Sequence, residues 1–302
     1  MKLINKLSLT LLAATVSAAS LADPITVYGK ANISAQAADE GEGDFTELKS
    51  NASRFGVKGD LKLDNDLEVL YKFEWQVDLA DEAGSDNIKS RNQYVGLKGD
   101  FGSVLLGRND TVLKQSQGKI DLFNDYEADL KGLWKGENRM GDSVTYFSPK
   151  FNGFTLGVSY VAEDDVEGDD AQSISLNYGD RNLKKGKWFA SVAADFDMKG
   201  YDTQRASVQG KFDDLKLGAI LHRQESVETG ESKDGVMVSA AYTIGKVVLK
   251  GQVQTLEDDN SVSIGADYKL AKSTKAFIWY TDRGLDNSED KSWLAAGLEH
   301  RF

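Results

Sequence analysis

The 302-residue chain contains no cysteine and only two prolines. The lack of cysteine excludes a disulfide framework and a lipid-modified cysteine. Long apolar runs are also missing beyond residues 7–21, and that run falls short of the roughly 20 residues that a membrane-spanning helix needs. A basic start followed by this run and by small residues before Asp23 is typical of a secretory signal. We therefore predict a signal peptide over residues 1–22 and an exported chain over residues 23–302.

Acidic residues dominate the charge, with 48 Asp and Glu against 36 Lys and Arg and a net charge of −12. Loss of Lys2 and Lys6 with the signal peptide would leave −14. So acidic a chain is a poor nucleic-acid binder, and we expect no nucleic-acid partner. The composition, with 29 glycines and 11 tyrosines, suits one large all-β domain or two smaller ones, and it fits a soluble sandwich as well as a membrane barrel.

Alternation of side-chain types favours the barrel. Residues 25–36 place apolar or small side chains on one face and polar ones on the other, a period of two held for twelve residues. Sixteen such segments are expected, near residues 25–36, 54–61, 67–79, 90–99, 103–108, 142–149, 154–162, 171–179, 187–196, 203–212, 215–224, 235–244, 247–255, 261–270, 275–281 and 292–302. Sixteen strands of about ten residues can cross a bilayer and close around a water-filled channel.

The connections between these segments alternate between short and long. Tight turns, such as Asp64-Asn65-Asp66 and Asp213-Asp214, take turns with longer acidic connections near residues 38–49, 80–89, 109–141, 163–170, 225–234 and 282–291. This asymmetry is typical of an outer-membrane barrel with periplasmic turns and extracellular loops, and a Greek-key sandwich has no reason to keep it. We predict a single all-β domain, a 16-strand antiparallel up-and-down barrel.

The longest insert, residues 109–141, breaks the strand rhythm. Asp121, Asp125 and Asp129 recur every four residues, with Leu122, Phe123, Tyr126 and Leu130 on the other side of the same helical wheel. We therefore expect a short amphipathic helix, and a loop that folds inward, lays its apolar side on the barrel wall and aims its carboxylates at the lumen. Aromatic residues near strand ends, among them Trp75, Trp188, Trp279 and Trp293, could form girdles at the lipid interfaces.

The final strand ends on Phe302, with His300 and Leu298 on the same face. A terminal phenylalanine on an alternating strand looks like the signal by which outer-membrane barrels reach their assembly machinery. Together with Val27-Tyr28-Gly29-Lys30, with Ser53-Arg54-Phe55-Gly56-Val57-Lys58-Gly59 and with Gly107-Arg108-Asn109, the sequence resembles the general diffusion porins of Gram-negative bacteria over the whole mature chain.

This resemblance implies a homotrimer in the outer membrane, surrounded by lipid and lipopolysaccharide, in which each barrel passes small hydrophilic solutes and ions. The third extracellular loop would narrow each pore. Carried over motif by motif, the acidic residues of that constriction are Asp121 and Asp125, and the basic wall residues are Lys30, Arg54, Arg91 and Arg139. Lys30 and Arg54 also fall on the polar faces of their strands, whereas Arg91 shares its face with Val95 and Leu97.

Two other classes of function compete with a passive channel. An outer-membrane barrel enzyme of lipase or protease type would depend on His222, but no serine, cysteine or carboxylate stands at a catalytic spacing from it. A secreted soluble adhesion or binding module would leave cells without detergent. We expect no enzyme, cofactor or metal site, although the acidic runs 39–44 and 163–170 could attract divalent cations. Because acidic mouths concentrate cations, we also predict a modest cation preference.

Overall fold

The computed structural model describes residues 25–80, 87–163 and 170–302. The predicted signal peptide, residues 1–22, lies outside the described residues. The strands are β1 (Thr26–Asp39), β2 (Asp44–Ser50), β3 (Arg54–Lys62), β4 (Glu68–Val77), β5 (Ile88–Gly99), β6 (Gly102–Asp110), β7 (Arg139–Phe147), β8 (Phe154–Val161), β9 (Ala171–Gly179), β10 (Trp188–Phe196), β11 (Tyr201–Phe212), β12 (Leu215–Ser226), β13 (Ser232–Ile244), β14 (Val247–Leu256), β15 (Asp259–Ala271), β16 (Thr274–Gly284) and β17 (Lys291–Arg301). A short helix, α2 (Val112–Ser116), and a 3-10 turn, η1 (Leu130–Gly132), lie between β6 and β7.

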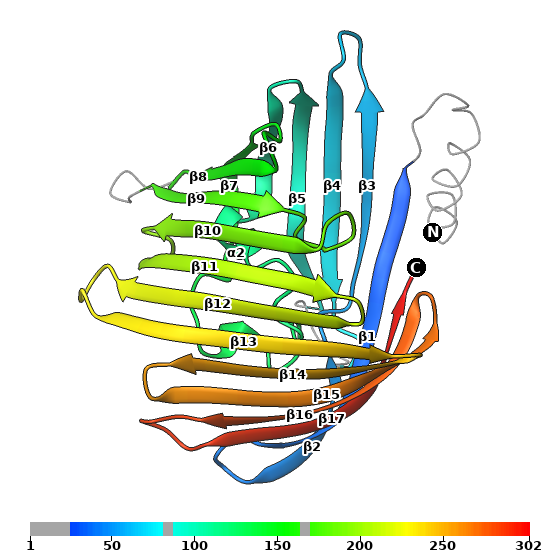
Figure 1. The fold of residues 1–302 in the computed structure, drawn as a ribbon, viewed down its shortest axis with the longest axis vertical. Coiled ribbons are helices and arrows are strands. Elements are labelled where there is room, and N and C mark those ends of the chain that lie inside the picture. The colour runs from blue at the N-terminus through cyan, green and yellow to red at the C-terminus, as the bar shows by residue number, and fades with distance from the viewer. Residues whose placement is uncertain (1–24, 81–86, 164–169) are drawn as a thin grey trace, which may run out of the picture.

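These strands form one closed antiparallel barrel (Figure 1). Each strand from β3 to β17 pairs with the next, and β1 closes the sheet against β17, with Lys30 opposite Arg301 and Ala35 opposite Ala296. The segments β2 and β3 both pair with β1, so they are two parts of one interrupted strand. The barrel therefore has the sixteen strands that the alternation predicts. Closure leaves no open sheet edge, which is the condition for a sheet in hydrocarbon.

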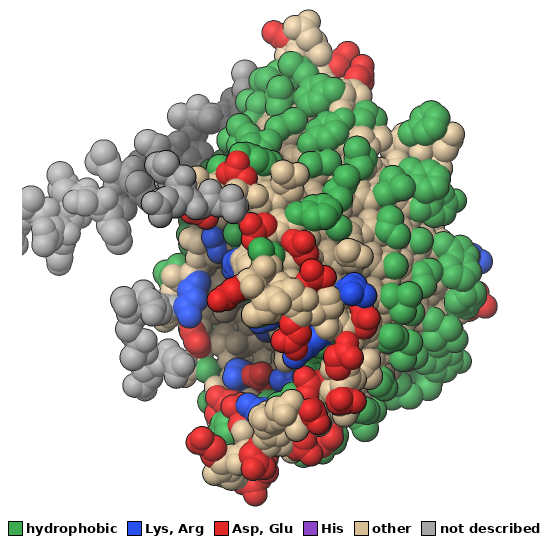
Figure 2. All heavy atoms as spheres, turned by 90° about the vertical axis from the view of Figure 1, so that its left-hand side faces the viewer, with side chains coloured by type: hydrophobic (Ala, Val, Ile, Leu, Met, Phe, Trp, Pro, Cys, Tyr) green, Lys and Arg blue, Asp and Glu red, His purple; other side chains and the backbone are tan. Residues whose placement is uncertain are grey.

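Polarity is inverted relative to a soluble protein. Along β15, Ser261 and Ser263 are buried, whereas Val262 and Ile264 between and beside them are 42% and 60% exposed. The same alternation runs along β1, where Asn32 and its polar neighbours face inward. Apolar side chains cover the flank of the molecule in Figure 2, while charged side chains gather around and inside the hollow at its mouth. This arrangement suits lipid outside and water inside.

Within the described residues, no helix is long and apolar enough to cross a membrane.

Two details of the predicted elements need correction. Residues 38–49 were expected to be a long loop, but β1 continues to Asp39 and β2 begins at Asp44, so most of this segment is strand. Trp279 and Trp293, which were expected in lipid-facing girdles, are buried inside the barrel at 1% and 2% exposure. Their phase in β16 and β17 places them on the inner face with Thr281 and Ala295, where the segment between β6 and β7 packs against them.

That segment, residues 111–138, is called loop 3 below. It lies within the barrel and its apolar side chains contact the wall, as expected. Phe123 and Tyr126 pack on Phe277 and Trp279 of β16, with the Tyr126 ring centre 5.0 Å and 5.5 Å from those of Phe277 and Trp279. A second cluster joins loop residues Ile120, Leu130 and Trp134 to wall residues Ile220, Met237 and Leu256. Burial of this apolar surface holds the loop against one side of the lumen.

Wall residues also satisfy the backbone of loop 3. The Gln252 Oε1 atom accepts from the Leu122 N–H at 2.9 Å, and Gln254 donates to the Leu130 carbonyl at 2.8 Å. A wall glycine, Gly218, leaves the space that Ile120 fills, since a Cβ atom there would lie 2.7 Å from the Ile120 side chain. Buried backbone groups need hydrogen-bond partners, so these contacts determine the path of the loop backbone along the wall.

Candidate functional site

Arg54 reaches the lumen beside Lys30 because the second strand is interrupted. Ser50 of β2 pairs with Ile33, but Arg54 of β3 pairs with Lys30, so three residues of this strand oppose two residues of β1. The extra residue is a β-bulge in which Ala52 adopts a φ of 48°. A shift of one residue moves every following side chain to the other face of a sheet. The bulge therefore turns Arg54 inward, beside Lys30.

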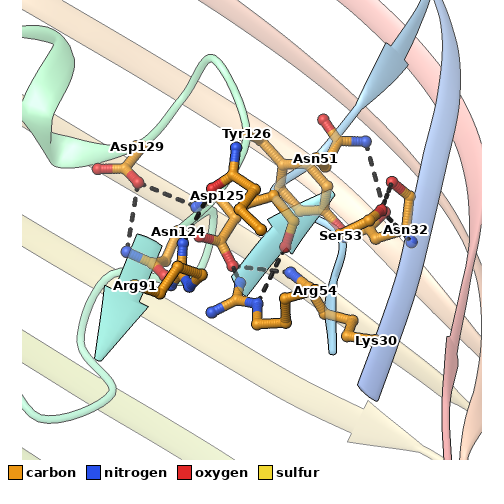
Figure 3. Close-up of polar contacts among 12 residues, drawn as sticks. Lys30, Asn32, Asn51, Ser53, Arg54, Arg91, Asn124, Asp125, Tyr126 and Asp129 are labelled. Carbon is orange, nitrogen blue, oxygen red and sulfur yellow. Dashed lines mark hydrogen bonds and ion pairs between the residues drawn. The ribbon is translucent and has the colours of Figure 1, made fainter. Parts of the chain in front are cut away.

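Buried polar side chains hold the bulge in place. The Ser53 hydroxyl donates to the Asn32 carbonyl at 3.0 Å and accepts from the Asn32 N–H at 2.9 Å. Asn51 donates to the Ser34 hydroxyl at 2.9 Å. These bonds replace the ladder bonds that the interruption removes (Figure 3).

Asp125 of loop 3 points at this pair of basic residues (Figure 3). Its Oδ2 atom lies 2.7 Å from the Lys30 Nζ atom and also accepts from the Arg54 guanidinium. The backbone of Asp125 has a φ of 76°, and its N–H donates to Asp129 Oδ2 at 2.9 Å. We call Lys30, Arg54 and Asp125 the lumen charge cluster.

Electrostatics keep the Asp125 carboxyl ionised. Burial alone would raise its pKa, but the charges of Arg54 and Lys30 outweigh burial and hold that pKa well below its usual range. Asp125 therefore carries a full negative charge at neutral and mildly acidic pH. The cluster contains two cations and one anion.

Asp121 does not join this cluster. It is buried, and its carboxylate accepts from the N–H groups of Phe123 at 2.9 Å and Leu130 at 3.1 Å. Burial, followed by the charge of Asp129, raises the pKa of Asp121. Asp121 thus organises the loop backbone, and of the two predicted acidic residues only Asp125 contacts the basic wall.

The predicted helix around these residues was wrong. Residues 121–129 form successive turns, and helical structure is confined to α2 and η1 on either side of them. Asp121 and Asp129 bond to nearby backbone N–H groups, and such bonds compete with helical ones.

Arg91 and Arg139 lie on the same wall but pair with other carboxylates. The Arg91 Nε atom lies 2.9 Å from Glu74, and an Nη atom of Arg139 lies 2.9 Å from Asp110. Glu74 and Asp110 come from strands β4 and β6, and their roles were not predicted. Glu74 stands on the polar face of β4, so alternation could have identified it as a lumen residue. Asp110 has the phase of Val104 and Leu106 in β6, and a register shift between Gly107 and Asn109 separates it from them, so alternation gives no such signal for Asp110.

One water-accessible cavity of about 780 Å³ is lined by Arg54, Arg91, Asp110, Asp125 and Arg139. Among the described residues, nine basic and five acidic side chains line it. The basic ones are Lys49, Arg54, Lys72, Arg91, Lys114, Lys119, Lys131, Arg139 and Arg181. The acidic ones are Asp110, Asp125, Glu127, Asp129 and Glu137. The cavity is thus lined mainly by positive charge although the whole chain is negative.

A buried arginine that the sequence analysis missed anchors the far side of loop 3. An Nη atom of Arg205 in β11 lies 2.7 Å from the Glu137 carboxylate, and another donates to the Lys135 carbonyl at 2.7 Å. Burial raises the pKa of Glu137 although the Arg205 charge opposes this. Arg205 was not distinguishable in the sequence because its strand carries polar residues at every second position.

His222 belongs to the same anchor. Its ring stacks on Trp134 of loop 3 at a centroid distance of 4.4 Å and accepts from the Arg205 Nε atom at 3.3 Å. Its other ring nitrogen lies 3.1 Å from Gln224. His222 therefore packs and positions the loop in this structure, and no group of three or more His, Cys, Asp or Glu residues in the described part of the chain could hold a metal ion.

The C-terminal residues close the barrel. Phe302 and Gly29 exchange two backbone hydrogen bonds, of 2.9 Å and 3.2 Å, and the Phe302 ring lies over Gly29, where a Cβ atom would collide with it. Leu298 and Phe302 are 46% and 64% exposed on the outer face, and His300 bonds to Thr274 at 2.8 Å.

Comparisons with known proteins agree with this architecture. The family model of the Gram-negative porins matches residues 8–288. The major outer membrane proteins P.IB of Neisseria meningitidis and Neisseria gonorrhoeae are each 26% identical to this chain, and the alignments cover 99% of this chain and 100% of the relatives.

Solved structures show the same fold. An anion-selective porin from Comamonas acidovorans superimposes with a TM-score of 0.73 at 19% identity, covering 93% of this chain and all of that one. OmpF of Salmonella typhi, in complex with daunomycin, gives 0.75 at 15% identity, with 93% and 98% covered. OmpT of Vibrio cholerae in its trimer form gives 0.67 at 14% identity, with 93% and 100% covered.

A closed sixteen-strand barrel with an apolar outer face and a charged, water-accessible lumen defines a transmembrane channel of the bacterial outer membrane. This chain belongs to the Gram-negative porin family and is an outer-membrane porin. The family resemblance expected from the sequence is confirmed.

Proposed function

We propose that this porin allows passive diffusion of small hydrophilic solutes and ions, and that the lumen charge cluster forms its constriction. The observation that carries the proposal is Asp125 on an inward-folded loop, in direct ion pairs with Lys30 and Arg54 of the wall at the edge of the cavity. Opposed charges across a water-filled gap create a transverse field that orders water and favours polar solutes able to align in it. Arg91 and Arg139 extend the basic side of this field.

The sign of the ion preference depends on which charges dominate. Acidic side chains around the mouth (Figure 2) favour cations there, and this supports the modest cation preference expected from the sequence. The cavity lining favours the opposite sign, with nine basic against five acidic side chains among the described residues. We propose that the cavity decides, because salt screens charges at the open mouth more strongly than charges in a narrow lumen.

Single-channel recording in a planar bilayer tests both parts of the proposal. A porin gives stepwise increases in conductance, and a reversal potential in a KCl gradient gives the sign of the preference. Absence of steps at any protein concentration would remove the channel proposal. A clear cation preference would show that the mouth dominates the cavity.

We also propose a homotrimer, in line with the trimer form reported for the Vibrio cholerae neighbour. Conductance steps in groups of three would support it. The exposed apolar residues of the outer face would contact lipid, lipopolysaccharide or neighbouring copies. The terminal residues Leu298, His300 and Phe302 would be read by the barrel assembly machinery, since they lie exposed on the last strand.

A further inference from the structure

Two of the cations that line the cavity differ from the others. Among the described residues, seven of the nine basic side chains have a carboxylate oxygen within 4.0 Å, but Lys119 and Arg181 have none. Their charges are therefore not neutralised by direct ion pairs. Both side chains are exposed to the water of the lumen.

Lys119 and Arg181 come from opposite ends of the barrel. Lys119 lies in loop 3, whereas Arg181 belongs to the β9–β10 connection, residues 180–187, at the end that carries the tight turns. One side chain of the wall, Gln209 of β11, holds both: its Oε1 atom accepts from the Lys119 N–H at 3.3 Å and its amide donates to the Arg181 carbonyl at 2.6 Å. The two backbones are thus separated by one amide group and two hydrogen bonds.

The surroundings leave both cations available. Arg181 donates from one Nη atom to Gln115 at 2.8 Å, and within the described residues its other N–H groups meet no acceptor. The adjacent Asp180 carboxylate is occupied by the N–H groups of residues 182, 184 and 185. Enclosure, followed by the charge of Arg181, lowers the pKa of Lys119, which is consistent with two cations held near each other.

We propose that Lys119 and Arg181, positioned by Gln209, form a binding site for small oxyanions such as phosphate and organic carboxylates. A guanidinium and an ammonium converging on one cavity supply the charge-assisted donors that such anions bind. This site is separate from the lumen charge cluster, in which Asp125 already occupies the cations. A permeating anion would bind there transiently, at a position in the lumen other than the lumen charge cluster.

This inference rests on the proposed channel, so it needs a test that can fail separately. Inorganic phosphate and, in a parallel series, acetate would be titrated into single-channel recordings made in KCl. We expect both anions to reduce the chloride current in the wild type with saturation. Lys119→Gln and Arg181→Gln should each raise the half-blocking concentration at least several-fold. Lys131→Gln is the matched control, because Lys131 lines the same cavity but lies 4.0 Å from Asp129.

A third variant separates position from charge. Gln209→Met removes both hydrogen bonds while leaving both cations, and it should weaken the block without changing the number of charges. Equal weakening in Lys131→Gln would point to general lumen charge and would overturn the site, as would unchanged block in Lys119→Gln and Arg181→Gln or no block in the wild type. Calorimetry of phosphate binding to detergent-solubilised protein needs no conduction, so it tests the site even if the channel proposal fails.

Discussion

Lys30 and Arg54 stand directly opposite each other in the register of β1 and β3, and both side chains point into the lumen. Two like charges in such a pair repel each other, so the arrangement depends on the shared Asp125 carboxylate. It also depends on the bulge at residues 51–53, without which Arg54 would face lipid. The charge cluster is therefore a joint product of a strand irregularity and an inward-folded loop.

The bulge can be tested by cysteine labelling, because the chain has no cysteine of its own. Lys49→Cys and Arg54→Cys should both react with a charged, water-soluble thiol reagent in the folded, membrane-inserted protein. Leu48→Cys and Phe55→Cys, on the lipid face, should react at least about tenfold more slowly, because the thiolate that reacts is disfavoured in apolar surroundings. An uninterrupted strand would protect residue 54 and label residue 55, which would contradict the register described above.

Much of this architecture could be predicted from the sequence. Strict alternation located the sixteen strands, since lipid on one side and water on the other enforce a period of two along every strand. The same alternation placed Lys30 on the lumen face directly. Arg54 follows the alternation of its own segment, residues 54–61, which lies entirely after the bulge. The bulge gives no signal in the sequence, because Asn51-Ala52-Ser53 is a stretch without alternation.

Loop 3 could be predicted less well. Its apolar residues correctly indicated contact with the wall. The four-residue spacing of Asp121, Asp125 and Asp129 indicated a helix, but the same spacing also arises when aspartate side chains bond to the backbone of successive turns. The partners of the loop lie far away in sequence: Arg205 is 68 residues from Glu137, and Gln252 is 130 residues from Leu122. Local patterns carry no information about such pairs, so the loop anchor and the carboxylate partners of Arg91 and Arg139 became visible only in the structure.

Replacing Asp125 with asparagine should shift selectivity towards anions. A unit charge about 4 Å away contributes roughly 1 kcal/mol in water, so loss of the carboxylate should lower the K⁺/Cl⁻ permeability ratio about fivefold. Conduction should persist. The control is Asp121→Asn, which should leave the reversal potential unchanged while destabilising the loop by about 1–3 kcal/mol, because asparagine offers one acceptor oxygen and leaves one of the two buried backbone N–H groups unpaired. An equal shift in both variants would refute the distinction between the two aspartates.

The contribution of Asp125 should be insensitive to mild acid. A carboxyl whose pKa is lower in the folded protein than in the unfolded chain contributes stability that is present above the unfolded pKa. That stability is lost only as the pH falls through the lower, folded value. Since the pKa of Asp125 lies well below its usual range, the difference in reversal potential between wild type and Asp125→Asn should stay constant from about pH 7 to pH 4. A difference that fades by pH 5 would mean that Lys30 and Arg54 do not hold this carboxylate.

The Arg205 anchor predicts a loop that loosens when one partner is removed. Arg205→Met leaves Glu137 buried without its closest cation, and breaking a buried ion pair in this way costs about 3–5 kcal/mol. We expect faster proteolysis within residues 111–138 and noisier single-channel currents. Removal of both partners, in Arg205→Met with Glu137→Gln, should restore part of the loss. The exposed pair Arg223 and Asp234, 3.5 Å apart, is the control, because its removal should cost less than about 1 kcal/mol.

Deletion of Phe302 should reduce the amount of folded barrel in the outer membrane more than it reduces the stability of barrels that do fold. The deletion removes two backbone bonds to Gly29 at the seam, where each bond contributes about 1 kcal/mol, so the folded protein should lose only a small part of its stability. Assembly in cells should fall more steeply if the exposed terminal residue is also a recognition signal. Cell fractionation measures the first effect, and refolding of purified protein into detergent measures the second.

Phe302→Tyr, which keeps the ring and the seam bonds, should behave as wild type in both assays. If deletion lowers refolding and cellular yield in proportion, Phe302 serves the seam alone and the recognition proposal fails.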